Sequence, residues 1–221
     1  MFRKNTHSLV TEAAGLVFSN PLGMPYALRK RRFACFHRAP STGFLVMTPP
    51  ASGSVLPWVK GLKTALPEGS VVAVDIHTDI VRTFSLVYDF ADFIIVDPDS
   101  DSGIGATDLA DIVALVDELV SLRLCYEHYT PVFLRLTHGI THDELQALLD
   151  TCRLSGLDGV VVPTLPMLAQ VREITLGRVP VICMVQNPED GLKALQNGAS
   201  LLEARPGFKG VKKLLKILET Q

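Results

Sequence analysis

Residues 132–164, with the sequence VFLRLTHGITHDELQALLDTCRLSGLDGVVVPT, follow the pattern strand, turn, helix, strand. The stretch opens with a short apolar run of β-strand length. Thr141 can cap a helix, and Glu144 three residues later completes a capping box. Gly156 ends the helical pattern, and residues 159–162 form a second apolar run. Two buried strands joined by one helix run parallel, because a parallel pair needs a long crossover. The stretch therefore predicts a βαβ unit.

The same alternation extends along the whole chain of 221 residues. Eight apolar runs predict strands, at residues 21–24, 44–47, 71–76, 93–96, 132–136, 159–162, 180–184 and 200–204. Helical patterns occupy residues 79–89, 107–125, 141–156, 166–176, 187–198 and 210–219, whereas the proline-rich residues 48–57 indicate a loop. Eight strands alternating with helices predict a single (β/α)8 TIM barrel as one domain over residues 1–221. An open, doubly wound sheet is the alternative. Residues 14–21 indicate a strand and a turn, so we expect a short N-terminal hairpin at the bottom of the barrel.

Composition and charge exclude several classes of protein. Apolar residues make up 48% of the chain, and the formal net charge of −2 gives no electrostatic argument for binding nucleic acid. The basic run at residues 29–32 is either a solvated helix face or an anion patch. No apolar stretch is long enough to span a membrane or to act as a signal peptide, so we expect a cytoplasmic protein. We expect a small-molecule partner, with a homodimer as the default oligomer.

The cysteine pattern also indicates a cytosolic protein. The chain has four, which are far apart in the sequence and include no CxxC pair: Cys35, Cys125, Cys152 and Cys183. This pattern is typical of buried, reduced thiols in a cytosolic protein.

Charged residues near the strand ends are candidates for chemistry, because TIM barrels build their sites at the carboxyl ends of strands. Asp75 and His77 are two residues apart and point the same way, as an acid–base pair or as loop anchors. Arg135 ends the fifth predicted strand. A buried arginine must bind an anion or be paired, and here it either binds a ligand or pairs internally with Asp75, Asp97 or Glu203.

Residues 97–103, DPDSDSG, follow the fourth predicted strand. Ser100 is a candidate catalytic base if a neighbour activates it, and otherwise part of a polar turn that caps the next helix. Three aspartates alternate in this segment, but the glycine and distal glutamate of an EF-hand loop are absent, so we predict no metal site. The single tryptophan, Trp58, is either a packing residue or part of a lid.

Four segments, in this order along the chain, resemble the dihydroorotate dehydrogenase (DHODH) family. They are GLVFSNPLGM at residues 15–24, ADFIIVDPDSDSG at 91–103, LRLTHGITHDEL…GLDGVVVPT at 134–164, and VPVICMVQNPEDGLKALQNGASLLEARPGF at 179–208. The resemblance implies an oxidoreductase of pyrimidine biosynthesis that oxidises dihydroorotate to orotate with flavin mononucleotide (FMN) as hydride acceptor.

The resemblance also implies roles for individual residues. It makes Ser100 the catalytic base and Asp97 the second catalytic residue, three residues earlier, where the family has a substrate-binding asparagine. Arg135, in place of a lysine, would contact the flavin. The other predicted cofactor-binding residues are Thr48, Arg205 and Gly207. The predicted substrate-binding residues are Asn20 and Thr164, joined by Asp75 from the strand-end argument.

Departures from the family pattern leave two hypotheses open. The glycines that would give amides to the FMN phosphate are replaced at about Val185 and Gln186, and side chains there hinder a close backbone approach. Asp97 also places an anion where an anionic substrate would bind. The first hypothesis is a DHODH-like, FMN-dependent oxidoreductase. The second is a barrel without FMN that serves as a small-anion binder, a partner subunit or a non-flavin lyase.

Overall fold

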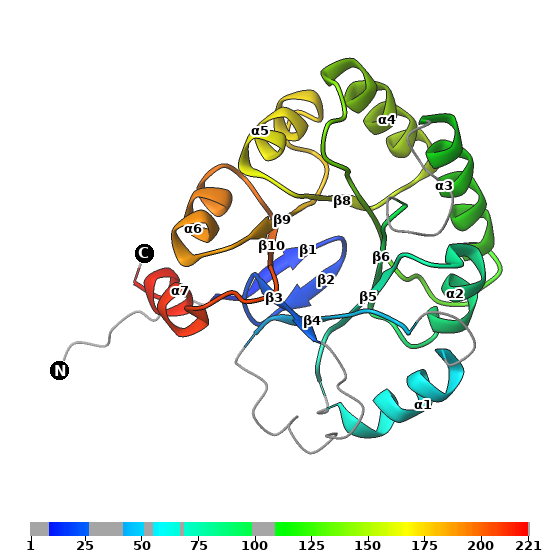
Figure 1. The fold of residues 1–221 in the computed structure, drawn as a ribbon, viewed down its shortest axis with the longest axis horizontal. Helices are drawn as coiled ribbons and strands as arrows, with labels where there is room; N and C mark the ends of the chain where they lie inside the picture. The colour runs from blue at the N-terminus through cyan, green and yellow to red at the C-terminus, as the bar shows by residue number, and fades with distance from the viewer. Residues whose placement is uncertain (1–8, 27–41, 51–54, 67–68, 99–108, 221) are drawn as a thin grey trace.

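Eight parallel strands close into a barrel in a computed structural model that describes residues 9–26, 42–50, 55–66, 69–98 and 109–220 (Figure 1). The strand order is β10-β3-β4-β5-β6-β7-β8-β9, so the last strand closes onto the first strand of the barrel. The strands are β3 (Leu22–Tyr26), β4 (Phe44–Met47), β5 (Val72–Ile76), β6 (Phe93–Val96), β7 (Val132–Arg135), β8 (Gly159–Val162), β9 (Val181–Val185) and β10 (Leu201–Ala204). All eight predicted strands are confirmed, and their ends differ from the predicted ends by at most two residues. The fold is a (β/α)8 TIM barrel, and the doubly wound alternative is wrong.

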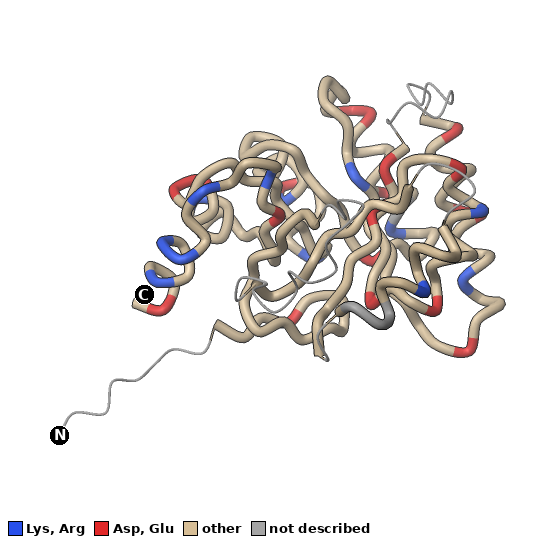
Figure 2. Tube along the Cα trace, turned by 60° about the horizontal axis from the view of Figure 1, so that its bottom comes forward, with Lys and Arg blue, Asp and Glu red and all other residues tan. Residues whose placement is uncertain are grey.

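Helices surround the barrel on its outside (Figure 1). They are α1 (Val55–Ala65), α2 (Ile80–Val87), α3 (Leu109–Arg123), α4 (His142–Ser155), α5 (Leu165–Ile174), α6 (Pro188–Gln196) and α7 (Val211–Leu218). Figure 2 shows the basic positions of α7 close together near the C-terminus, whereas acidic and basic positions are mixed over the other helices. The capping box at the start of α4 forms as predicted, since the amide of Thr141 donates to Glu144 and the amide of Glu144 donates to the Thr141 hydroxyl.

The prediction of a loop over residues 48–57 is wrong from Val55 onward, because α1 begins there. Pro57 lies in the first turn, where a missing amide hydrogen costs no helical hydrogen bond. Val59 and Leu62 are buried behind it at helical spacing. Trp58 packs edge-on against Phe90 with ring centroids 6.2 Å apart, which favours the packing interpretation over a lid.

The predicted N-terminal hairpin is confirmed as β1 (Thr11–Ala13) and β2 (Leu16–Phe18), paired antiparallel. Its two-residue turn has positive φ at both positions, 50° at Ala14 and 77° at Gly15, as tight hairpins of the type I′ class require. Ala13 and Phe18 are buried against the residues that fill the barrel. Figure 1 shows the hairpin lying across the end of the barrel, so it closes the amino-terminal end of the lumen.

Aromatic rings fill the lower half of the lumen. Phe93 lies at their centre, with its ring centroid 6.0 Å from that of Phe18, 5.4 Å from Phe44 and 5.5 Å from Phe133. Two inward-facing glycines make room for these rings. A Cβ atom at Gly23 would lie 2.1 Å from the Phe44 ring, and one at Gly159 would lie 2.3 Å from the Phe133 ring.

The cysteine prediction is confirmed for one thiol and wrong for another. Cys183 is buried in β9, whereas Cys125 is exposed because it follows the last turn of α3. Cys35, the basic run at residues 29–32, and Ser100 with Asp99 and Asp101 lie outside the described residues. Within the described ranges, no helix is both long enough and apolar enough to cross a membrane.

Candidate functional site

The upper half of the lumen is charged. Side chains two positions apart on a strand point to the same face, so the residue two positions after each lumen-packing residue also faces inward. The inward pairs are Ala73 with Asp75 on β5, Ile95 with Asp97 at the end of β6, Phe133 with Arg135 on β7, and Leu201 with Glu203 on β10. We call Asp75, Asp97, Arg135 and Glu203 the charge cluster.

Arg135 is the centre of the charge cluster. Its Nη2 atom lies 3.0 Å from Oδ2 of Asp75 and 3.2 Å from Oε2 of Glu203. Its Nε atom lies 3.4 Å from Oδ2 of Asp97, and Nη1 donates to the sulfur of Met184 at 3.0 Å. The internal pairing predicted for Arg135 is therefore present, and with all three proposed carboxylates together.

Three carboxylates face one guanidinium in a buried setting, and this shifts their protonation. Burial raises the pKa of Glu203 to about 7, with the nearby Asp75 and Asp97 adding to the rise against the opposing effect of Arg135. Burial also raises the pKa of Asp75, although Arg135 and His77 act in the opposite direction. Although burial opposes its charge, the three carboxylates hold the pKa of Arg135 above its usual value. The charge cluster thus keeps its cation and carries a carboxylate that titrates near neutrality.

One atom of the charge cluster has no partner. Oδ1 of Asp75 is buried, and no hydrogen-bond donor of the described chain reaches it. A buried acceptor without a donor is costly, so the charge cluster leaves one hydrogen bond unmade at this atom.

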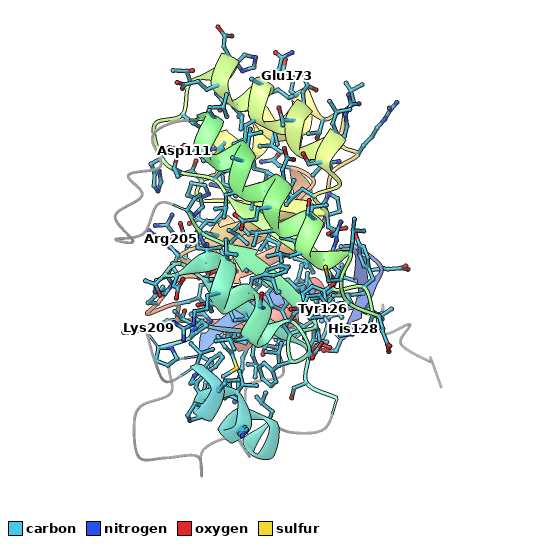
Figure 3. The ribbon with its side chains drawn as sticks, turned by 90° about the vertical axis from the view of Figure 1, so that its right-hand side faces the viewer. Asp111, Tyr126, His128, Glu173, Arg205 and Lys209 are labelled. Carbon is cyan, nitrogen blue, oxygen red and sulfur yellow. The ribbon has the colours of Figure 1, made fainter. Side chains whose placement is uncertain are left out.

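A pocket of about 270 Å³ opens above the charge cluster at the carboxyl end of the strands. Its lining residues are Asp97, Arg135, Leu136, Thr137, His138, Pro163, Met184 and Arg205. Figure 3 shows Arg205 and Lys209 at one end of the barrel, with Tyr126 and His128 at the opposite end. The Arg205 guanidinium donates to the carbonyl of Pro163 at 2.7 Å, which holds it against the pocket wall. The pocket walls thus carry one acidic residue, Asp97 directly after β6, and two basic residues, Arg135 of β7 and Arg205 directly after β10.

The structure brings part of the predicted site together. Asp75, Asp97 and Arg135 meet in the charge cluster, and Arg205 lies in the wall of the same pocket. His77 is near enough to Asp75 to lower its pKa. These residues come from four different strands, as expected for a site at the mouth of a barrel.

Other predicted residues lie elsewhere. Asn20 precedes β3 at the amino-terminal end of the barrel, where its side-chain oxygen accepts from the amides of Leu22 at 3.1 Å and Gly43 at 3.0 Å. The structure therefore places Asn20 at the end of the barrel opposite the pocket, in a structural role.

Thr164, Thr48 and Gly207 lie at the carboxyl end but do not line the pocket. The hydroxyl of Thr164 caps α5 by accepting from the amide of Met167 at 3.4 Å. Thr48 is exposed directly after β4, and Gly207 is exposed in the turn after β10, with φ of 87°. Their roles in binding stay predictions.

The sequence reasoning gave no site role to Met184 or Thr137, and it named Glu203 only as a pairing option. The signal for Met184 and Glu203 is the strand alternation, because each stands two residues after an apolar residue that packs in the lumen, Ile182 and Leu201.

The loop after β9 does not fit the phosphate of FMN. Asn187 caps α6 with its own side chain, whose oxygen accepts from the amide of Asp190 at 2.9 Å. Pro188 has no amide hydrogen, and Glu189 and Asp190 place negative charge in the first turn. A phosphate needs free amides at a helix N-terminus and is repelled by acids there. Gly207 after β10 has open space around it, but one loop alone makes half of the predicted cradle.

The residues predicted to contact the flavin ring do not fit FMN either. The predicted flavin contact was Arg135, whose guanidinium nitrogens all face the three carboxylates or Met184. The described residues therefore do not fit FMN in the predicted arrangement.

No protein-family model matches this sequence, and no curated protein matches it. Among solved structures, the chain is similar to DHODH from Eimeria tenella in complex with ferulenol, with a TM-score of 0.76 and 17% identity over 100% of this chain and 87% of that one. It is also similar to the ligand-free form of that protein, with a TM-score of 0.72 and 15% identity over 92% and 83% of the two chains. An aldolase described as QR15 gives a TM-score of 0.62 and 14% identity over 80% and 83%. The likeness establishes a (β/α)8 barrel shared with DHODH structures and an aldolase.

Proposed function

We propose that this chain is a barrel enzyme that binds a small molecule in the pocket above the charge cluster and transfers a proton to or from it without bound FMN. The observation that carries this proposal is the charge cluster itself, a buried set of carboxylates that reaches the pocket wall through Asp97. Burial raises the pKa of Glu203 to about 7, and buried groups with shifted pKa values gather at functional sites.

Each member of the charge cluster has a distinct part in the proposal. Asp97 lines the pocket, so it is the group that takes a proton from the substrate and returns it. Arg135 holds the Asp97 carboxylate in place through its Nε atom. Asp75 and Glu203 are positioning residues, because they fix the other end of the same guanidinium.

The competing form is FMN-dependent oxidation of dihydroorotate. It is supported by the fold likeness to DHODH across the full length of the chain. Against it stand the capped start of α6 with its two acidic residues and the occupied guanidinium of Arg135.

A visible absorption spectrum of the purified chain distinguishes the flavin-free proposal from FMN-dependent oxidation. An FMN titration follows if the protein is colourless. We expect a colourless protein and no saturable binding of FMN. A yellow protein that releases FMN on denaturation would overturn the flavin-free form and make dihydroorotate the first substrate to test.

Proton transfer is tested without knowing the natural substrate. The protein is incubated in D₂O with small carbonyl compounds, with and without an amino group, and exchange of their C–H protons is followed by NMR. We expect Asp97→Asn to slow the exchange by a factor of about 10²–10⁴, the usual contribution of a positioned acid or base. Glu189→Gln is the matched control, because it removes the same charge at an exposed ion pair with Lys213. Equal rates in wild type and Asp97→Asn would contradict the role of Asp97.

A further inference from the structure

We propose that the substrate group that enters the charge cluster is a cationic nitrogen, a protonated primary amine held by Asp97 and Asp75 beside Arg135. This inference rests on the proposed function, since it names the class of substrate for the same pocket. It argues against an anionic ligand at Arg135, one of the alternatives that the sequence leaves open.

The first argument is the balance of charge. Asp75, Asp97 and Glu203 carry three carboxylates, and Arg135 supplies the one guanidinium within the charge cluster. An anionic group placed here adds further negative charge in a largely buried setting, where charges are weakly screened. A cation instead reduces the surplus of negative charge.

The second argument is the unpartnered acceptor. Oδ1 of Asp75 is buried without a donor, whereas Oδ2 of the same carboxylate is bound to Arg135. An ammonium group has three hydrogen-bond donors and no acceptor. It can therefore donate to the carboxylate oxygen that lacks a partner, and it brings no acceptor that would itself need a donor.

The third argument is the geometry around Arg135. Asp97 contacts the Nε atom and Asp75 contacts the Nη2 atom, and these two nitrogens form one edge of the planar guanidinium. The two carboxylates therefore lie on the same side of Arg135, and Asp97 raises the pKa of Asp75 through this proximity. Asp97 lines the pocket with 22% of its side chain exposed, and Asp75 on the neighbouring strand has 16% exposed, so an amine that enters the pocket contacts Asp97 first.

The walls of the pocket suit an organic amine better than a metal ion. Leu136, Pro163 and Met184 line the pocket with apolar surface that can cover a short carbon chain. Within the described part of the chain, no three His, Cys, Asp or Glu side chains are placed to hold a metal ion. The guanidinium of Arg135 already lies among the carboxylates that a metal would need.

Three probes of the same length test the charge preference. Propylammonium, propionate and propanol are titrated into the full chain by ligand-observed NMR at equal ionic strength and at about pH 8, where an alkyl amine stays protonated. We expect propylammonium to bind at least about ten-fold more tightly than either other probe, a difference of about 1.4 kcal/mol. Asp75→Asn and Asp97→Asn should each remove that preference, and Glu189→Gln should keep it.

Equal affinities, a preference for propionate or no binding of any probe would overturn this inference. If Asp75→Asn does not fold by circular dichroism, Asp97→Asn provides the same test from the pocket wall. Failure here is distinguishable from failure of the proposed function. Amine preference without Asp97-dependent proton exchange supports the cation site and overturns the acid–base function, and exchange without amine preference does the reverse.

Discussion

The two ends of the barrel lumen are built on the same strands but carry opposite chemistry. At the amino-terminal end, Phe133 of β7 packs among aromatic rings. Two residues later on the same strand, Arg135 lies among three carboxylates. Strand geometry makes both residues face inward, so only the identity of the side chain sets the two layers apart.

The difference shows which layer holds the fold together. Packed rings gain stability from burial and edge-to-face contacts. Buried ion pairs recover little beyond the desolvation of their charges, and apolar residues of similar size are often at least as stabilising. The charge cluster is therefore not needed to hold the barrel together, and we infer that it is kept for what it does at the pocket.

Removing the Phe93 ring should cause the largest loss of stability of any single substitution proposed here. Phe93→Ala deletes the ring that contacts Phe18, Phe44 and Phe133, and it should lower the free energy of unfolding by about 3–5 kcal/mol. No titratable group is involved, so urea unfolding should give the same loss at about pH 5 and about pH 8. Phe90→Ala, which removes a half-buried ring, is the control and should cost clearly less. A pH-dependent loss in Phe93→Ala would contradict the separation of the two layers.

Removing the cation of the charge cluster should cost nearly as much, but only where the carboxylates are ionised. Arg135→Met keeps most of the side-chain volume and leaves three buried carboxylates without their partner. We expect a loss of about 3–5 kcal/mol at about pH 8, and a smaller loss at about pH 5 as protons replace the guanidinium. Arg153→Met, at an exposed contact with Asp150, is the control and should change stability little. A pH-independent loss would mean that Arg135 acts by packing alone.

The sequence was sufficient for the barrel because its signals are local. The capping box at Thr141 and Glu144 and the apolar runs are each readable within a few residues, and the β3 to β10 strands follow them closely. Local signals were insufficient at the start of α1. Pro57 lies in the first turn of this helix, and its presence led to the prediction of a loop.

The site was less predictable because its members meet only through closure of the barrel. Asp75 and Glu203 contact one nitrogen of Arg135 although they are far apart in the chain, and pairing of β10 with β3 brings them together. The sequence could offer three partners for Arg135 but could not show that all three are used at once. Resemblance placed Asn20 at the substrate, whereas its position before β3 fixes it at the other end of the lumen.

Neutralising one carboxylate should alter the pH dependence of stability. The pKa of Glu203 is about 7 in the folded chain against an ordinary value of 4.5, so between these values the folded state binds more protons than the unfolded state. The free energy of unfolding should therefore fall as the pH rises through this window, by up to about 3 kcal/mol. Glu203→Gln removes this contribution, and its stability relative to wild type should increase with pH. The raised pKa of Asp75 leaves a residual slope of the same sign. Parallel pH profiles for wild type and Glu203→Gln would show that Glu203 is ionised throughout.

Asn20 gives the smallest effect and the sharpest test of which end of the lumen is structural. Its side-chain oxygen satisfies the amides of Leu22 and Gly43, so Asn20→Ala should lower the free energy of unfolding by about 1–3 kcal/mol. Asn20→Asp keeps an acceptor and should retain more of that stability. Since Asn20 lies at the end of the barrel opposite the pocket, neither change should alter the affinity for propylammonium. Weaker amine binding in a folded Asn20→Ala protein would contradict this separation, because it would couple the aromatic layer and its closing hairpin to the charge cluster above them.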